Sequence, residues 1–177
     1  VDGTLITHSL DVGLALPEVL VAYESSGTES YLHLPNTIAT DDGAAWSYSG
    51  ADGLGSVRQE LDSSGRVAGV NSFRPFGTPL TGNGGDPYGF TGEWWTTYAN
   101  RGILYLRARY LAPEVGRFLS PDTIIPDFWN PPSIHRYSYV HNSPVNFTDP
   151  SGHQVTPPDC EPGEICFSGT LAPYNPG

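Results

Sequence analysis

The stretch that decides the fold is residues 102–122, Gly-Ile-Leu-Tyr-Leu-Arg-Ala-Arg-Tyr-Leu-Ala-Pro-Glu-Val-Gly-Arg-Phe-Leu-Ser-Pro-Asp. Apolar and aromatic residues alternate with arginines over about nine positions, which is typical of a half-buried strand. Residues 113–116 then predict a turn, and Arg117 begins a second short run. The stretch therefore predicts a β-hairpin.

The segments around this hairpin carry the same kind of pattern. Residues 46–49, 56–61 and 67–73 predict short strands separated by glycine-containing turns, and Asp42-Gly43 is a favoured hairpin turn. Further upstream, residues 1–24 predict two strands separated by Pro17. The sequence therefore predicts an all-β fold of stacked antiparallel hairpins with turn-rich connections.

Composition supports this fold class and limits the size of the protein. The 21 glycines and 17 prolines make up more than a fifth of the 177 residues, which excludes long helices. A chain of this length forms one domain, with or without extended arms. It contains no heptad pattern and no apolar run long enough to cross a membrane.

The charge and the polar residues exclude several functions. Eight arginines, no lysine and 19 acidic residues give a net charge of −11, which is the wrong sign for a nucleic-acid partner. The five histidines are scattered, and only His135 and His141 have a spacing that would suit a metal; surface or hydrogen-bonded histidines are the favoured interpretation. No nucleophile motif of the Gly-x-Ser-x-Gly type is present. We therefore expect no metal and no cofactor.

The two ends of the chain suggest a processed, exported protein. The sequence contains no methionine, so we expect that Val1 was created by removal of a preceding segment. Cys160 and Cys166 lie in a Pro- and Gly-rich tail, and a local disulfide is favoured over a metal or redox site. A disulfide predicts a secreted, extracellular or cell-surface location.

Several motifs together resemble the RHS repeat-associated core domain, which ends the YD-repeat proteins. They are Leu-Gly-Ser-Val-Arg at 54–58, Gly-Phe-Thr-Gly at 89–92, the stretch 105–122, and residues 136–152, which end in Asp-Pro-Ser-Gly. The resemblance covers about residues 44–153. It predicts an N-terminal arm with the first strands at 1–43, an RHS-core-like β domain at 44–153, and a C-terminal arm at 154–177.

The resemblance also implies a site. Proteins of this family coil a ribbon of β-hairpins into a hollow shell, and in toxin members the core domain cuts the chain just after a final Asp-Pro-x-Gly motif, in an aspartyl-protease-like reaction. Carried over by motif, the paired carboxylates are Asp122 and Asp149, with Arg117 or Arg136 as a charged neighbour. One carboxyl of such a pair acts as a base while the other holds a proton.

Two departures leave a structural interpretation open. His153 stands where toxin members typically have Leu, and Asp122 is followed by Thr123 rather than by Pro. Aspartates beside Pro and Gly also form turns by accepting backbone hydrogen bonds, so Asp122 and Asp149 are either turn formers or an inherited dyad, active or vestigial. The tail at 154–177 has no catalytic constellation, so we expect that it is not an enzyme toxin.

Aromatic residues are numerous and admit two interpretations. They could form a carbohydrate-binding platform, but in β-repeat proteins such residues more often stack between hairpins as core. We favour the core. The residues concerned are Trp46, Tyr48, Trp94, Trp95, Tyr98, Tyr105, Tyr110, Phe118, Trp129, Tyr137 and Tyr139.

Two hypotheses for function follow. The first is a secreted, non-enzymatic structural protein of a bacterium, which binds other copies of itself through β-edges and terminal arms to build a filament, tube or sheath. The alternative is an autoproteolytic, aspartyl-protease-like core module of a polymorphic toxin or contact-dependent delivery protein. The first predicts homopolymers, and the second predicts cleavage that depends on the aspartates.

Overall fold

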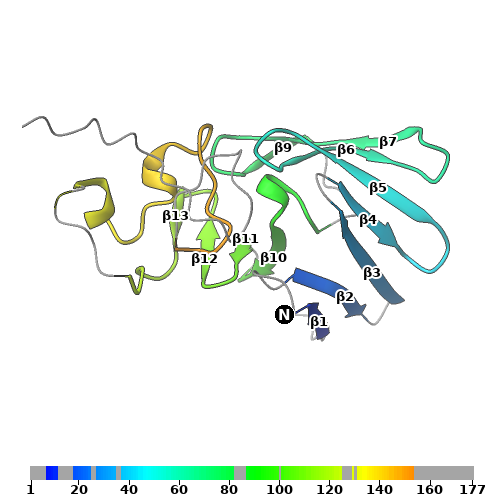
Figure 1. Ribbon diagram of the computed structural model, residues 1–177, viewed down its shortest axis with the longest axis horizontal. Coiled ribbons are helices and arrows are strands. Elements are labelled where there is room, and N and C mark those ends of the chain that lie inside the picture. The colour runs from blue at the N-terminus through cyan, green and yellow to red at the C-terminus, as the bar shows by residue number, and fades with distance from the viewer. Residues whose placement is uncertain are drawn as a thin grey trace, which may run out of the picture.

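The computed structural model describes residues 7–11, 18–24, 27–34, 37–81, 87–99, 101–124, 129 and 131–153. This part of the chain is built almost entirely from antiparallel strands, which confirms the predicted all-β class (Figure 1). Its only helical elements are three short 3-10 turns, η1 (Phe90–Gly92), η2 (Pro131–Ile134) and η3 (Val140–Asn142). None of its helices is long and apolar enough to cross a membrane.

The first seven strands form one sheet in which every strand pairs with its neighbour in sequence. We call these strands and their turns the meander. Aspartates close its tight turns: Asp42 Oδ1 accepts hydrogen bonds from the backbone of Ala44 and Ala45, at 2.8 and 2.9 Å. The strands are β1 (Thr7–Asp11), β2 (Glu18–Glu24), β3 (Gly27–Leu34), β4 (Thr37–Asp41), β5 (Trp46–Ala51), β6 (Val57–Leu61) and β7 (Val67–Val70).

Two smaller sheets follow the meander. Strands β8 (Ser72–Phe73) and β9 (Pro79–Thr81) form a short hairpin. A four-stranded sheet then contains β10 (Trp94–Tyr98), β11 (Arg101–Leu106), β12 (Arg109–Ala112) and β13 (Arg117–Phe118). We call residues 87–153, which include this sheet and the loops after it, the terminal unit.

The predicted strand over the first half of residues 102–122 is wrong in one respect, because it contains a tight turn. Arg107 and Ala108 join β11 to β12, and Leu106 pairs with Arg109 across the turn. Arg107 has a φ of +50°, a conformation that arginine rarely adopts, so alternation in the sequence gave no sign of it. Its ion pair with the buried Glu93, and a hydrogen bond from Ala108 N to Ser151 O, hold the turn. The predicted turn at 113–116 is confirmed by the hydrogen bond from Gly116 N to Ala112 O, at 2.9 Å.

One face of the four-stranded sheet carries the main core. Leu104 and Leu111 are fully buried there, and they lie directly opposite each other on β11 and β12. Burying each of these large apolar side chains contributes about 1.5–3 kcal/mol. The cluster consists of Phe90, Leu104, Leu106, Leu111, Phe118, Tyr139 and Val140.

The opposite face of this sheet packs against the meander. Trp94 meets Tyr31 of β3 edge to face with ring centroids 5.6 Å apart, and Tyr88 meets Trp94 in the same way at 5.2 Å. In Figure 1, β10 and β11 lie between β1 and β2 below and strands β5–β7 above. The terminal unit is thus held by the meander through aromatic contacts.

The aromatic residues divide between core and surface. Trp94, Phe118 and Tyr139 are buried, and Trp95 and Tyr105 pack against the two cores, as the favoured interpretation predicts. Others are exposed, so the prediction that all of them fill the core is wrong for these: Trp46, Tyr48, Tyr98, Tyr110, Trp129 and Tyr137.

The predicted domain boundaries remain a prediction. Strands β1–β4, from the expected arm at 1–43, pair in the same sheet as β5 from the expected core. The expected C-terminal arm at 154–177 and the Cys160–Cys166 disulfide lie outside the described residues.

Candidate active site

Arg109 lies at the centre of a charged cluster in the terminal unit. On β12 it shares the core-facing side with Leu111, and its side chain is only 5% exposed. The guanidinium carbon lies 3.6 Å from the centroid of the Phe118 ring, and Nη1 donates to the carbonyl oxygen of Arg136 at 3.0 Å. Burial lowers the pKa of Arg109, and the charges of Asp122 and Asp149 oppose this shift. The side chain stays protonated, since arginine does not lose its proton in proteins.

The structure brings the two predicted aspartates together on this arginine. Nη2 of Arg109 lies 2.9 Å from Oδ2 of Asp122 and 3.3 Å from Oδ2 of Asp149. The Asp122 side chain is 15% exposed and that of Asp149 is 3% exposed. Two carboxylates that are far apart in the sequence therefore meet at one guanidinium nitrogen.

Each aspartate also accepts hydrogen bonds typical of a turn former. Asp149 Oδ1 accepts from His153 N at 2.9 Å and from Ser151 Oγ at 3.3 Å. Asp122 Oδ1 accepts from Ile124 N at 2.9 Å. The first oxygen of each side chain thus caps its own turn, while the second oxygen faces Arg109.

The cluster contacts both sides of the peptide bond between Gly152 and His153. The carbonyl oxygen of Gly152 accepts a hydrogen bond from Arg109 Nε, and the amide of His153 donates to Asp149 Oδ1. Gly152 has a φ of +76°, and a Cβ at this position would lie 2.3 Å from the carbonyl oxygen of Leu106. Glycine is therefore required for this peptide bond to approach the arginine.

The two predicted charged neighbours occupy different positions. Arg136 is exposed, and its Nε donates to the backbone oxygen of Asp122 at 2.8 Å, so it holds the main chain rather than a carboxylate. Arg117 is exposed on β13, where its backbone pairs with Ala112 and Ser138. Within the part of the chain that the structure describes, no ion pair joins Arg117 to either aspartate.

Sequence reasoning missed two members of the cluster. Arg109 was part of the quoted alternation, and the only available sign was that it falls on the same strand face as Leu111. His153 departs from the family pattern in the sequence, and in the structure its Nδ1 lies 2.7 Å from Asp122 Oδ1. Neither contact is visible in local sequence, because both join segments that are distant along the chain.

A buried tyrosine lies next to the cluster. Tyr139 is fully buried, and its hydroxyl has no hydrogen-bond partner among the described residues. Thr91 and the backbone of Asp149 lie near the hydroxyl but without hydrogen-bond geometry. Burial raises the pKa of Tyr139, so the phenol stays neutral and acts as a packing group.

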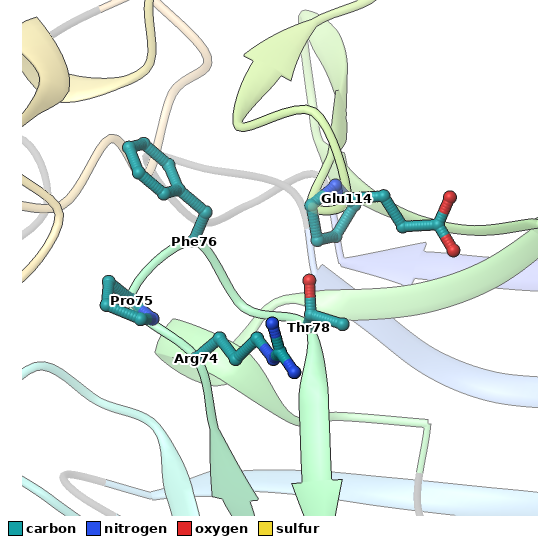
Figure 2. A pocket seen from close by; sticks show the side chains of 6 residues that line it. Arg74, Pro75, Phe76, Thr78 and Glu114 are labelled. Atoms are coloured by element: carbon teal, nitrogen blue, oxygen red, sulfur yellow. The ribbon is translucent and has the colours of Figure 1, made fainter.

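A separate pocket of about 380 Å³ lies between the β8–β9 turn and the β12–β13 turn (Figure 2). Arg74 and Glu114 are its charged residues, and in Figure 2 the Glu114 carboxylate points away from Phe76. Neither aspartate of the cluster lines the pocket. Across the described residues, no three histidine, cysteine, aspartate or glutamate side chains are placed to hold a metal ion.

The comparisons with known proteins place the fold. No family model matches the chain, and no curated protein matches it. Solved structures do match it. The TcdB2-TccC3-Cdc42 crystal structure matches with a TM-score of 0.61 and 21% identity, and the match covers 86% of this protein and 8% of the matched chain. TcdB2-TccC3 without its hypervariable C-terminal region gives a TM-score of 0.60 at 20% identity.

A Photorhabdus luminescens structure gives the same result. The Tc holotoxin pore, solved with a mutated TccC3, matches 93% of this chain and 10% of its own chain, with a TM-score of 0.51 and 20% identity. The protein thus shares its fold with a segment of chains in the TcdB2-TccC3 and Tc holotoxin structures. It spans about a tenth or less of the chains that it matches.

Proposed function

We propose that this chain is part of an RHS-type β-hairpin shell in a toxin-associated protein, and that Arg109, Asp122 and Asp149 cleave the chain beside the Asp-Pro-Ser-Gly motif. One observation carries the proposal. The guanidinium that contacts both carboxylates also donates to the Gly152 carbonyl, while Asp149 accepts the amide of the next residue. Arg109 and Asp149 therefore contact this peptide bond directly, and Asp122 contacts the same guanidinium.

The proposed reaction consumes one water. One proton is shared between the two carboxyl groups, and the ionised carboxylate removes a proton from the water, whose oxygen attacks the carbonyl carbon of Gly152. Arg109 stabilises the negative charge that develops on the carbonyl oxygen. The protonated carboxyl group donates its proton to the nitrogen of His153 as the C–N bond breaks. The products are a carboxylate at Gly152 and a new amino terminus at His153.

The fold supports the shell part of the proposal. The meander is a ribbon in which each strand pairs only with its neighbours in sequence, so further hairpins can continue it beyond β1. The matched structures contain this fold as a small part of much longer chains. A segment of this size does not enclose a cargo alone, so the shell function belongs to a longer protein.

The proposal is tested by cleavage in the full precursor. We expect the wild-type chain to release a C-terminal fragment that begins at His153, identified by intact mass and N-terminal sequencing. Asp122→Asn and Asp149→Asn should each abolish this release, because neither a proton donor nor a base remains at the changed position. Asp52→Asn, which changes an aspartate of the meander paired with Arg58, is the matched control. Unchanged release in both site variants, each shown to be folded by thermal unfolding, would contradict the proposal.

A second candidate function is self-association of a secreted structural protein, which an exposed apolar row favours. Cross-strand partners Leu32, Ala39, Tyr48, Leu61 and Val67 run across β3–β7 on one face of the meander. Leu32, Tyr48 and Val67 are 49%, 39% and 57% exposed, whereas Leu61 is half-buried and Ala39 is buried between its neighbours. Strands β1 and β7 are also the outer strands of the sheet, with one edge unpaired among the described residues.

Self-association is tested by light scattering and electron microscopy. We expect the wild-type chain to form regular polymers at neutral pH and Val67→Lys to remain monomeric, because a charge on an outer strand blocks edge pairing. Val145→Lys, which changes an exposed valine outside the sheets, is the control. A wild-type chain that stays monomeric would remove this candidate.

A further inference from the structure

We infer that His153 is a positioning residue of the proposed cleavage, because its imidazole anchors the residue that follows the cut to the Asp122 carboxylate. The inference rests on the proposed function and deepens it. It assigns a role to the side chain of His153, which would be the first residue of the released fragment. It therefore predicts which residues are acceptable at that position.

His153 contacts both aspartates at once. Its backbone N–H donates to Asp149 Oδ1 at 2.9 Å and also lies 3.1 Å from Ser151 Oγ. Its ring Nδ1 lies 2.7 Å from Asp122 Oδ1. One residue thus binds one carboxylate through its main chain and the other through its side chain, which fixes the peptide bond relative to both.

The imidazole also limits how the Asp122 carboxylate can turn. Oδ2 of Asp122 faces Arg109, while Oδ1 accepts from Ile124 N and contacts His153 Nδ1. A carboxylate with donors on both oxygens has a fixed orientation, as a group that must remove a proton from one water requires. The His153 side chain is 27% exposed, so the anchor lies at the solvent-facing side of a buried cluster.

The charged groups around the imidazole come from several elements. Asp122 follows β13, Asp149 belongs to the last described turn, and Arg109 projects from β12. Arg136 contacts the backbone oxygen of Asp122. Since the carboxylate oxygens accept and Arg109 only donates, His153 serves the cluster as a donor through Nδ1.

The position of the His153 Nδ1 donor determines which substitutions test the inference. Nδ1 of histidine is separated from Cα by Cβ and Cγ, and Nδ2 of asparagine occupies the equivalent place. The amide nitrogen of glutamine lies one bond further out, and alanine has no donor. His153→Asn, His153→Gln and His153→Ala therefore vary the donor while leaving the backbone contacts possible.

We expect the rate of fragment release to depend on a hydrogen-bond donor at the position of His153 Nδ1. In the full precursor, His153→Ala and His153→Gln should slow release by at least about tenfold, while His153→Asn restores it to within about fivefold of the wild-type rate. His135→Ala, which changes an exposed histidine outside the cluster, is the matched control and should leave the rate unchanged. A wild-type rate in His153→Ala overturns the inference.

Failure of the inference can be told apart from failure of the proposed function. If Asp122→Asn and Asp149→Asn abolish release while all three His153 variants release the fragment at the wild-type rate, only the positioning role of His153 is wrong. If release persists in both aspartate variants, the proposed function is wrong.

A second measurement tests the anchor without cleavage. In an Asp149→Asn background, in which both chains are expected to stay uncleaved, adding Asp122→Asn should change the NMR resonance of His153 Nδ1 and its bound proton. Identical imidazole spectra in the two chains would show that the contact is absent and would overturn the inference.

Discussion

The meander and the terminal unit differ in where they place backbone strain. In the meander, the described residues with positive φ are all glycines, such as Gly43 and Gly65 in hairpin turns. Every described non-glycine residue with positive φ lies in the terminal unit: Thr91, Ala99, Arg107, Val140, His141 and Asn142. Such residues cost about 1–3 kcal/mol each and persist where the surrounding structure holds them, often at functional sites. The strain thus lies in the part of the chain that contains the Arg109 cluster.

The meander and the terminal unit also differ in how deeply they bury their ion pairs. The meander pairs Arg58 with Asp52 at 2.7 Å, with side chains that are 42% and 27% exposed. The terminal unit buries Arg109 between two carboxylates. An exposed pair contributes little, whereas a buried charge that loses its partner is costly. The comparison predicts that equivalent substitutions will have much larger effects in the terminal unit.

Removal of the central arginine should have the largest effect. Arg109→Met leaves Asp122 and Asp149 without their shared cation, which should lower the free energy of unfolding by about 3–5 kcal/mol. Arg58→Met in the meander should cost no more than about 1 kcal/mol. Urea denaturation of both variants measures the difference. Equal losses would show that burial of the charge does not distinguish the two regions.

The comparison also explains what the sequence could predict. Hairpins of the meander were predictable because strand alternation and Asp-Gly turns are local signals, as at Asp42-Gly43. The pair formed by Asp122 and Asp149 was predictable from the motifs shared with the RHS core domain. The contacts of Arg109 and His153 were not found, because β12, the loop after β13 and the last turn meet only in three dimensions. The turn at Arg107 was missed because a left-handed arginine has no sequence signature.

Two glycines of similar backbone conformation give the next largest contrast. Gly152 and Gly65 have φ of +76° and +79°, but an added Cβ would lie 2.3 Å from Leu106 O at the first and meet nothing within 4 Å at the second. Gly65→Ala should cost about 1 kcal/mol from strain alone. Gly152→Ala should cost about 3 kcal/mol, because backbone must also move. Thermal unfolding compares them, and similar losses would show that the close contact at Gly152 is easily relieved.

Two tyrosines are expected to respond with opposite sign. Tyr139 has a buried hydroxyl without a hydrogen-bond partner among the described residues, so Tyr139→Phe should be neutral or stabilising by up to about 1 kcal/mol. Tyr31 of the meander donates its hydroxyl to Glu29, and Tyr31→Phe should destabilise by about 1–2 kcal/mol. Chemical denaturation measures both. A clear loss in Tyr139→Phe would mean that its hydroxyl has a partner, such as a buried water.

The smallest effect is expected in a meander turn and depends on pH. The hydrogen bond from the Ser64 side chain, followed by that from the backbone of Arg66, lowers the pKa of Asp62 below its ordinary value of 3.8. Because the folded state favours the ionised form, this contribution to stability is fully present above the unfolded pKa and is lost as pH falls through the folded one. Asp62→Asn should therefore unfold at a slightly lower temperature than the wild type at about pH 6, and this difference in unfolding temperature should shrink towards about pH 3.

Ser64→Ala should raise the Asp62 pKa towards 3.8 in an NMR titration, since the largest cause of the shift is removed. An unchanged pKa in Ser64→Ala would show that the backbone of the turn, rather than the serine hydroxyl, holds the carboxylate ionised.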